Sequence, residues 1–278
     1  MKKVITDNLK EIIIKDYLSK PTKIQEIAEK YSLSSPTVIK ILGKTKRWPK
    51  HILYNPDLDE DYFNNIDSDE KGYYLGLFIS DGNIYDPIAH HKKQVQKFAS
   101  ITLKLDDEYM LKNFIKAVKS NINISHDGRG CGQACIRSTI FCDNLSKYGV
   151  IPNKTLLTYF PQNVNKKYWN SIVRGIFDGD GNIYLRKTNR RFNHSLNFCG
   201  THKLMQDLVN IISEELNLNV IPKVYDYKDR NLSEIKFQNI HDIELICNWM
   251  YGDSDLYLTR KRDKYAEFMK HYNMTIPR

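Results

Sequence analysis

The 278-residue sequence lacks any apolar run long enough to span a bilayer, so we expect no membrane partner. Its start, MKKVITDNLKEIIIKDYL, has Lys2 and Lys3 but neither an uninterrupted apolar stretch nor a small-residue cleavage site, which predicts no signal peptide. The five cysteines are an odd number, which favours reduced thiols over a disulfide framework. Together these absences predict a cytoplasmic protein without a targeting segment.

Several common catalytic and ligand-binding patterns are also missing. No Gly-Lys-Ser/Thr follows a glycine-rich loop, and no Ser-His-Asp order stands out. The segment DGDGN at 178–182 begins like an EF-hand loop, but Ile183 and Asn189 stand where that loop needs Gly and Glu. A zinc site is a minor alternative at His126, Cys131, Cys135 and Cys142. The glycine-rich tip GRGCGQ in that region favours a loop instead.

Acidic residues are outnumbered, with 33 Asp and Glu against 42 Lys and Arg, which gives a net charge of +9. Such an excess suggests a polyanionic partner, most often nucleic acid. The basic residues also cluster, at 44–51 and 186–194. By contrast, the segment 57–70 has seven acidic residues and no Lys or Arg. Any one of these runs could equally be a solvated face.

The N-terminal region predicts three short helices. Residues 6–18 read as an amphipathic helix, whose apolar face would consist of Leu9, Ile12, Ile13 and Tyr17. Residues 22–42 have the spacing of a helix-turn-helix, with small Ala28 at the helix crossing and Ser32 where such turns often have Gly. The second helix of this motif would offer Thr37 and Lys40 to a DNA groove. A plain three-helix bundle used only for packing remains the alternative.

The rest of the chain reads as two halves with the same order of elements. We predict a helix-turn-helix domain at 1–47, a linker at 48–67, a first half at 68–164 and a second half at 165–278. Each half is expected to be αββαββα, which makes the fold class α+β with a duplicated, pseudo-two-fold domain. Helices are predicted at 69–81, 107–119, 139–148, 167–180, 202–216, 239–251 and 259–271. Strands are predicted at 83–89, 96–105, 121–138 as a hairpin, 182–189, 194–200, 220–228 and 232–238.

A decapeptide is nearly repeated in the two halves. GLFISDGNIY at 76–85 and GIFDGDGNIY at 175–184 are identical at seven of ten positions. Asp81 and Asp180 fall at helix C-termini, where the helix dipole disfavours a carboxylate unless a cation offsets it. Gly82 and Gly181 follow, where a left-handed conformation is expected.

The same repeat predicts that the two helices touch. Gly76 and Ser80 share one helix face, as do Gly175 and Gly179. Small residues on facing surfaces would let the backbones approach closely and bring the two carboxylates together. Two adjacent carboxylates repel each other unless metal is bound, and oxygen ligands suit Mg²⁺.

These residues resemble the LAGLIDADG family of homing endonucleases, in the single-chain form with two motifs. The matching segments are YLGLFISDG at 74–82 and VRGIFDGDG at 173–181, supported by YGVIPNKT at 148–155 and LYLTRKR at 256–262. The resemblance covers about residues 60–270. Some phage and bacterial relatives carry an N-terminal helix-turn-helix as an accessory module.

The resemblance implies a monomer whose two antiparallel sheets form a saddle on the major groove of double-stranded DNA. Asp81 and Asp180 match the catalytic acids and metal ligands, and the backbone carbonyls of Ser80 and Gly179 match further ligands. Lys154 and Lys261 match basic residues that assist the scissile phosphate, although Arg260 and Arg262 compete with Lys261 for that place. Each site would cut one strand of a long asymmetric target, which leaves staggered ends. The first motif departs from the family by having Ile79 and Ser80 before its acid, whereas the second keeps Asp178.

Outward residues of the first hairpin in each half are the predicted DNA contacts. They are Asn83, Tyr85, Thr102 and Lys104 in the first half, and Asn182, Tyr184, Arg186, Arg190 and Asn197 in the second. The inward residues Ile101, Leu103, Ile183 and Phe198 are expected in the core.

Two other functions remain open from the sequence. One is a non-cleaving transcriptional regulator, since some bacterial regulators pair a similar fold with a helix-turn-helix but lose the acids. The other is an RNA maturase that binds intron RNA. Retention of both Asp81 and Asp180 favours cleavage.

Overall fold

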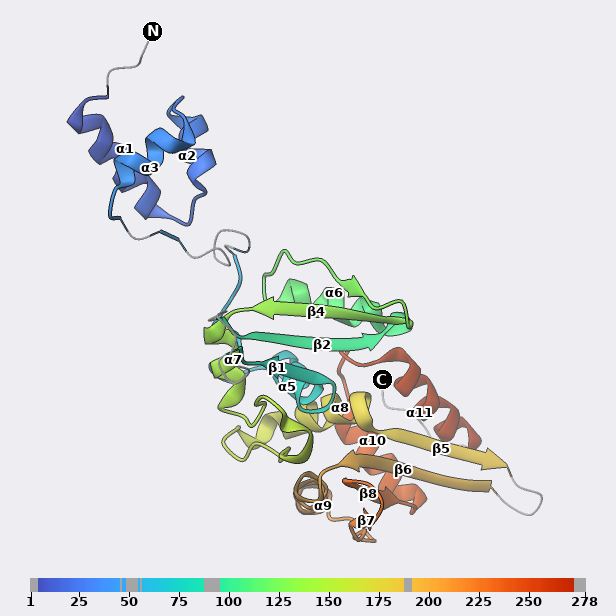
Figure 1. The fold of residues 1–278 in the computed structure, drawn as a ribbon. Helices are drawn as coiled ribbons and strands as arrows, with labels where there is room; N and C mark the ends of the chain where they lie inside the picture. Colours follow the sequence, from blue (N-terminus) through green and yellow to red (C-terminus); the bar gives the residue numbers. More distant parts are fainter. Residues whose placement is uncertain are drawn as a thin grey trace. The chain divides into compact units, whose positions relative to one another are not determined.

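The computed structural model describes residues 5–45, 47–48, 55, 57–87, 96–187 and 192–272. The contacts divide the chain into two compact units (Figure 1). One comprises Met1–Leu58 together with Lys119–Asn121, and the other comprises Asp59–Val118 and Ile122–Arg278. The predicted arginine contact at position 190 lies outside the described residues.

The described residues of the N-terminal unit form the helices α1 (Asp7–Ser19), α2 (Ile24–Lys30) and α3 (Ser35–Leu42). The side chain of Ser34 caps α3 by accepting a hydrogen bond from the Thr37 amide, and a proline follows in the first turn. The core cluster of this unit consists of Ile13, Tyr17, Ile27, Ala28, Val38 and Leu42. It is a small core, which Trp48 extends by donating its indole N–H to the Tyr17 carbonyl at 2.8 Å.

Two details of this unit differ from or sharpen the sequence reading. Ile12 was expected in the core, but it is 47% exposed, because Ile13 occupies the inward position of α1. Ser32 has a φ of 52°, so it adopts the left-handed conformation usually given to Gly at such a turn. Lys40 is exposed on α3, while the Thr37 hydroxyl lies 2.8 Å from that of Ser34. DNA binding by this unit stays a prediction.

The larger unit is built from two halves, each with one antiparallel sheet (Figure 1). Its first half contains α5 (Asp69–Ser80), β1 (Gly82–Tyr85), β2 (Phe98–Lys104), η1 (Leu105–Asp107), α6 (Glu108–Ala117), β3 (Ser125–His126), β4 (Cys131–Arg137) and α7 (Thr139–Ser146). Two short 3-10 turns, η2 (Lys154–Leu156) and η3 (Lys166–Tyr168), join it to the second half. The second half contains α8 (Trp169–Asp180), β5 (Asn182–Lys187), β6 (Phe192–Gly200), α9 (His202–Leu216), β7 (Tyr225–Tyr227), β8 (Leu232–Phe237), α10 (Ile240–Tyr251) and α11 (Thr259–His271).

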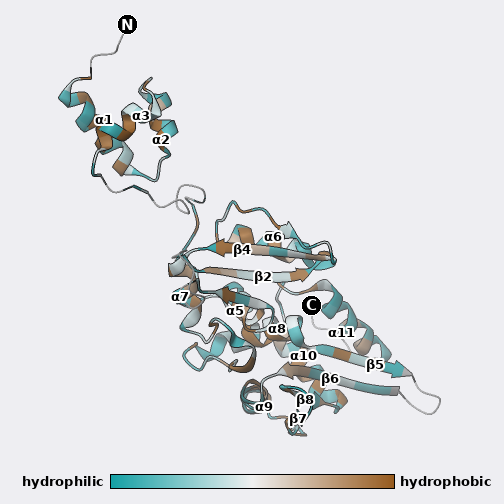
Figure 2. Ribbon diagram, in the orientation of Figure 1, coloured by the Kyte–Doolittle hydropathy of each residue, from teal (hydrophilic) through white to brown (hydrophobic). Residues whose placement is uncertain are grey.

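The two sheets have the same strand order, β1-β2-β4-β3 and β5-β6-β8-β7, and every pairing is antiparallel. The α+β class and the duplication are therefore confirmed. All four residues expected to face inward are buried, namely Ile101, Leu103, Ile183 and Phe198. Figure 2 shows this alternation as mixed hydrophilic and hydrophobic residues along β2, β5 and β6. No helix among the described residues is long and apolar enough to cross a membrane.

Part of the predicted linker belongs to the core instead. Tyr62, Phe63 and Ile66 are at most 8% exposed. The Phe63 ring makes edge contacts with Phe78 and Phe141, at centroid distances of 5.6 and 5.3 Å. The acidic residues around these three side chains obscured the apolar positions, so the linker predicted at 48–67 was drawn too long at its C-terminal end.

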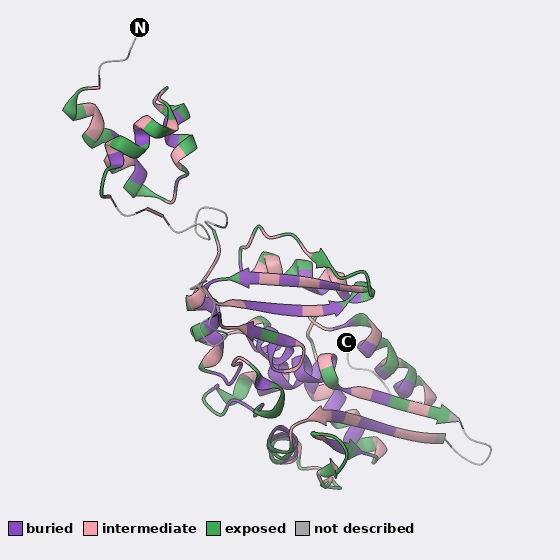
Figure 3. Ribbon diagram, viewed as in Figure 1, coloured by how far each residue is buried: buried purple, intermediate pink, exposed green. Residues whose placement is uncertain are grey.

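Helices α5 and α8 pack almost backbone to backbone in the centre of the larger unit. A Cβ atom placed on Gly76 would lie 2.2 Å from the Ile172 carbonyl oxygen and 2.8 Å from the Gly175 Cα. One placed on Gly175 would lie 2.1 Å from the Tyr73 carbonyl oxygen. No side chain fits at either position. Figure 3 shows both helices as almost entirely buried.

The conformation expected for Gly82 and Gly181 was wrong. Neither has a positive φ, and Gly181 is extended at φ −87° and ψ 166°. Glycine is required at these two positions because a side chain would not fit there, and not because the backbone is left-handed. A Cβ atom would lie 2.5 Å from the Phe78 ring at position 82 and 2.2 Å from the Phe177 ring at position 181. The two phenylalanines cover the ends of their own helices.

The helix contact predicts a large loss of stability for Gly76→Ala. Alanine favours an isolated helix by about 1 kcal/mol over glycine. That gain is outweighed, because the methyl group would overlap a backbone carbonyl and force the helices apart. We expect the free energy of unfolding to fall by at least about 3 kcal/mol, measured by urea denaturation.

Gly128→Ala serves as the control. Gly128 has a φ of +71° but nothing within 4 Å of its Cβ position. That change should cost no more than about 2 kcal/mol of backbone strain. Equal losses for the two variants would contradict the close approach of α5 and α8.

Candidate active site

The ends of α5 and α8 bring two carboxylates together. Asp81 is the C-cap of α5, where its amide donates to the Leu77 carbonyl at 2.9 Å, and Asp180 is the last residue of α8. A Cβ atom on Gly179 would lie 2.8 Å from Asp81 Oδ2 and 2.1 Å from Ser80 Oγ. The small residue at 179 therefore lets the Asp81 carboxylate reach the end of the neighbouring helix.

The two carboxylates are held in a charge-unfavourable place. Burial, together with the negative charge of Asp180, raises the pKa of Asp81 from 3.8 to about 6. Burial also raises the pKa of Asp180. Asp81 is half-buried and Asp180 is exposed, and within the described part of the chain neither carboxylate accepts a hydrogen bond that would give it a structural role. Such a pair costs folding free energy, which a bound cation would recover.

Two buried lysines lie beside the aspartates. Lys154, in η2, is 8% exposed, and its ammonium donates to the carbonyls of Ile79 at 2.7 Å and Ser80 at 3.0 Å. Lys261, in the first turn of α11, is 5% exposed and donates to the Gly181 carbonyl. Burial lowers the pKa of both side chains, that of Lys261 to about 8. The site therefore combines two carboxylates with two ammonium groups.

The donor set suits a divalent cation held partly by water. Among the described residues, no cluster of three or more His, Cys, Asp or Glu side chains could hold a metal alone. A cation at this site would therefore rely on Asp81, Asp180, backbone carbonyls and water, which is how proteins usually bind Mg²⁺. The Ser80 carbonyl, one predicted ligand, already accepts the Lys154 ammonium, so it has one lone pair left. The Ser80 hydroxyl points back to the Gly76 and Leu77 carbonyls.

Asp178 serves the site in a way that the motif did not reveal. Its fully buried carboxylate accepts hydrogen bonds from the hydroxyls of Tyr73 at 2.8 Å and Tyr251 at 2.9 Å. It also accepts the Leu258 amide at 2.6 Å, immediately before the helix that carries Lys261. The first half has Ile79 at the corresponding place, also buried. The sequence signal was an acid directly after the apolar pair Ile176 and Phe177.

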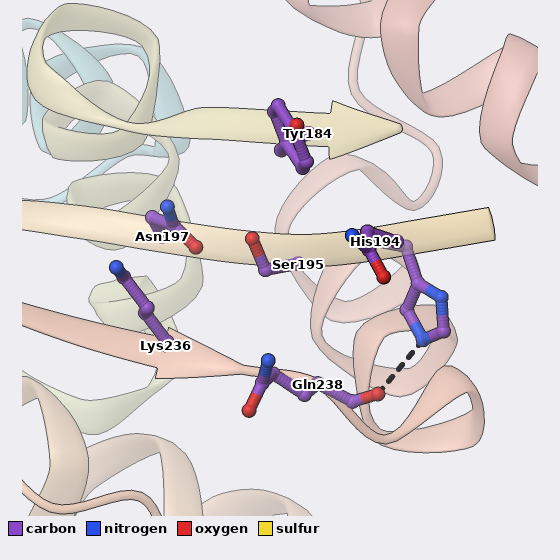
Figure 4. A pocket seen from close by; sticks show the side chains of 7 residues that line it. Tyr184, His194, Ser195, Asn197, Lys236 and Gln238 are labelled. Atoms are coloured by element: carbon purple, nitrogen blue, oxygen red, sulfur yellow. Dashed lines mark hydrogen bonds between the residues drawn. The ribbon is translucent and has the colours of Figure 1, made fainter. Parts of the chain in front are cut away.

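One face of the second sheet carries polar side chains around a pocket (Figure 4). Tyr184 is 38% exposed, and Arg186 is exposed beside it on β5. The Asn182 side chain oxygen accepts the Lys264 ammonium at 3.0 Å, so Lys264 joins this surface without having been predicted. The lining residues of the pocket are Tyr184, Asn193, His194, Ser195, Asn197, Lys236 and Gln238.

Asn197 is not free to read adenine with both amide atoms. Its Nδ2 donates to Glu234 Oε1 at 3.0 Å, and Glu234 also accepts the Lys236 ammonium at 3.0 Å. Glu234 was not among the residues predicted from the sequence. A bidentate contact between Asn197 and a base would first have to break the bond to Glu234.

The first sheet presents a different set of side chains. Asn83 and Lys104 are exposed, as predicted for DNA contacts. Tyr85 stacks on the Phe98 ring at 4.9 Å, and the Thr102 hydroxyl accepts the Gln133 amide at 3.0 Å. The two sheets therefore present different side chains to solvent.

The four residues of the zinc alternative are spread over three elements. Cys131 and Cys135 lie on β4, whereas Cys142 is buried in α7. The His126 imidazole is 2.6 Å from Glu108. The contact of His126 with Glu108 and the burial of Cys142 are typical of residues with a structural role.

Comparison with known proteins identifies the fold as that of the LAGLIDADG homing endonucleases. The I-LtrWI LAGLIDADG homing endonuclease bound to target DNA aligns over 77% of this chain and 92% of its own, with a TM-score of 0.51 and 14% identity. I-SmaMI, a LAGLIDADG homing endonuclease bound to cleaved DNA, aligns over 76% and 92%, with a TM-score of 0.51 and 12% identity. I-SmaMI bound to uncleaved target in the presence of calcium ions gives a TM-score of 0.52 at 12% identity, over 73% and 91%.

Sequence comparisons add little to the structural ones. No protein-family model matches the chain. A DNA-directed RNA polymerase subunit, Rpo1C of Methanocaldococcus jannaschii, is 27% identical over 128 residues. The match covers 43% of this chain but spans only 13% of the subunit's length.

The raised pKa of Asp81 predicts that Asp81→Asn stabilises the metal-free protein. The unfolded carboxyl titrates near 3.8 and the folded one near 6, so ionisation works against folding. Stability should fall as the pH rises through this window and level off above it. Removing the charge should therefore raise the free energy of unfolding by up to about 3 kcal/mol at pH 7.5, and much less at pH 4.

Urea denaturation in EDTA at the two pH values measures this difference. Asp106→Asn is the matched control, since Asp106 is exposed. An Asp81→Asn variant less stable than wild type at pH 7.5 would show that the carboxylate is structurally required.

Proposed function

We propose that this protein is a site-specific homing DNA endonuclease that makes Mg²⁺-dependent, staggered double-strand breaks in a long asymmetric target. The observation that carries the proposal is the pair of half-buried Asp81 and exposed Asp180 at the adjoining ends of α5 and α8, with the buried ammonium groups of Lys154 and Lys261 beside them. Catalytic sites are where burial and like charges shift carboxylate pKa values in this way.

Double-stranded DNA is the substrate that the surroundings favour. The net charge is +9, and the two sheets present exposed polar and basic side chains, among them Lys104 on β2 and Arg186 on β5. The structural neighbours I-LtrWI and I-SmaMI were solved with bound DNA. Because one chain supplies both halves, a monomer would be sufficient. Because the halves differ, the target would be asymmetric.

In the proposed chemistry, Asp81 and Asp180 hold the divalent cation, with help from the backbone at Ser80 and Gly179. Such a cation polarises the phosphodiester and makes an attacking water more acidic. The two ammonium groups, of Lys154 and Lys261, lie where negative charge would develop on the phosphate. A pKa near 8 also allows Lys261 to exchange a proton near neutral pH. One site on each half would cut one strand.

The N-terminal unit is proposed to add a second DNA contact through Thr37 and Lys40 on α3. The proposed organisation is a helix-turn-helix domain followed by a short linker and the two halves. This contact would extend the target beyond the bases that the two halves contact.

Cleavage of a host-genomic DNA pool tests the proposal. Wild type with Mg²⁺ should produce discrete double-strand breaks, and EDTA should abolish them. Asp81→Asn and Asp180→Asn should each reduce the rate by roughly 10²–10³-fold, the range for removing one electrostatic group from an active site. Residual activity is expected as nicks.

The same assay separates the alternatives. Specific DNA binding without cutting in any divalent metal would replace the enzyme by a regulator. Tight binding to intron RNA that survives loss of both aspartates would support a maturase. Asp106→Asn, which changes an exposed carboxylate, should cut at the wild-type rate.

Metal binding is tested separately from cleavage by thermal unfolding. Ca²⁺ is a suitable probe because a structural neighbour was solved in its presence. At a concentration of 100 times its dissociation constant, it should stabilise wild type by about 2.7 kcal/mol. The Asp81→Asn, Asp180→Asn double variant should show no shift. An equal shift in both proteins would place the metal elsewhere.

A further inference from the structure

The chain segments next to Lys154 and Lys261 each make side-chain hydrogen bonds to the opposite half of the larger unit. Lys261 belongs to the second half, but the residues just before it contact η1 and α6 of the first half. Lys154 belongs to the end of the first half, but the residues just after it contact α9 of the second. These two sets of hydrogen bonds are made by side chains to which the proposed chemistry gives no role.

The hydrogen bonds near Lys261 are made by Tyr109 and Asp107. The Tyr109 hydroxyl donates to the Tyr257 carbonyl at 2.9 Å and accepts the Thr259 amide at 2.7 Å. The Asp107 carboxylate, 1% exposed, accepts the Arg260 Nε at 2.7 Å. A buried carboxylate that receives a guanidinium in this geometry is a strong and directional contact.

The hydrogen bonds near Lys154 are made by Asp207 and Thr201. The Asp207 carboxylate, in a residue that is 5% exposed, accepts the Phe160 amide at 3.2 Å. The Thr201 hydroxyl donates to the Thr158 carbonyl at 2.5 Å. Thr201 is the N-cap of α9 and Asp207 lies in its second turn, and α9 follows β6 as α6 follows β2 in the first half.

These contacts control where the ammonium groups can be. Lys261 lies in the first turn of α11, where its amide donates to the Leu258 carbonyl at 2.8 Å. Any shift of the preceding residues would therefore move the Lys261 side chain relative to Gly181 and the two aspartates. Buried ammonium groups need fixed partners, since their desolvation is otherwise uncompensated.

We propose that Asp107 and Tyr109 are positioning residues for Lys261, and that Asp207 is the positioning residue for Lys154, so that each half places the catalytic lysine carried by the other half's segment. The inference rests on the proposed function for its consequence in catalysis. It makes the two cutting sites interdependent, because neither half alone contains both a lysine segment and its anchor.

Strand-resolved cleavage distinguishes positioning from general packing. Asp107→Ala and Tyr109→Phe should slow cutting of one strand about tenfold more than the other at saturating DNA, with KM little changed. Asp207→Ala should slow the opposite strand. Asp107→Asn keeps an oxygen that can accept from Arg260, so it should restore part of the rate. Equal slowing of both strands by all variants would overturn the proposal.

Asp106→Ala is the matched control, because it changes the adjacent, exposed carboxylate. It should leave both strands cut at wild-type rates, and a strand bias in this control would also overturn the proposal. Thermal unfolding checks that the variants are folded. If Asp107→Ala does not fold, Tyr109→Phe carries the test, because it removes only one hydroxyl.

Amine labelling tests the positioning without any catalysis. The full-length protein is treated with an acylating reagent, and the labelling rates of Lys154 and Lys261 are compared by mass spectrometry. Asp107→Ala and Tyr109→Phe should raise the rate at Lys261 several-fold and leave Lys154 unchanged, and Asp207→Ala should do the reverse. Unchanged rates at both lysines would overturn the positioning. A wild type that cuts no DNA but shows this labelling pattern would overturn only the proposed function.

Discussion

The contact of α5 with α8 at Gly76 and Gly175 is the constraint on which the rest of the larger unit depends. With no side chain between them, the two backbones set the distance and the angle between the halves. The sheets, the carboxylates and the lysine segments are all attached to these helices or to their ends. A side chain at either glycine would therefore disturb the site as well as the core.

The site formed by this contact is electrostatically costly for the protein alone. Half-buried Asp81 and exposed Asp180 lie close together at helix ends whose dipoles disfavour negative charge, and desolvation raises the pKa of both. The lysines reduce the net charge but bond to backbone carbonyls instead of to the carboxylates. The carboxylate oxygens thus stay available to a cation, which is what a binding site requires and a structural ion pair would prevent.

Much of this arrangement could be predicted from the sequence because it repeats. Two copies of one decapeptide with equal flanks identified the motif helices, their contact and the position of both acids. Helices α9 and α11 were predicted with their observed bounds, since each begins and ends at clear changes in hydrophobic periodicity. The strand β1 proved much shorter than expected.

What could not be predicted are the contacts between residues far apart in the chain. Asp178 looked like a motif acid, yet it accepts the amide of Leu258, eighty positions later. Glu234 looked like an ordinary strand residue, yet it holds Asn197 on the neighbouring strand. The buried Tyr62 and Phe63 were hidden by flanking acids, because composition averages over positions that point in opposite directions. Periodicity finds which face is apolar but does not identify the partner of a polar group.

The two halves hold the segments that carry Lys154 and Lys261 by different contacts. In the second half, Asp178 ties the lysine segment to its own motif helix as well as to the first half. In the first half, Ile79 cannot do so, and Lys154 itself bonds to the end of its motif helix. Each ammonium also donates to a carbonyl at the end of its own motif helix, so both lysines are placed in part by their own hydrogen bonds. The two halves therefore share a fold symmetry but differ in the contacts that hold the segments carrying these lysines.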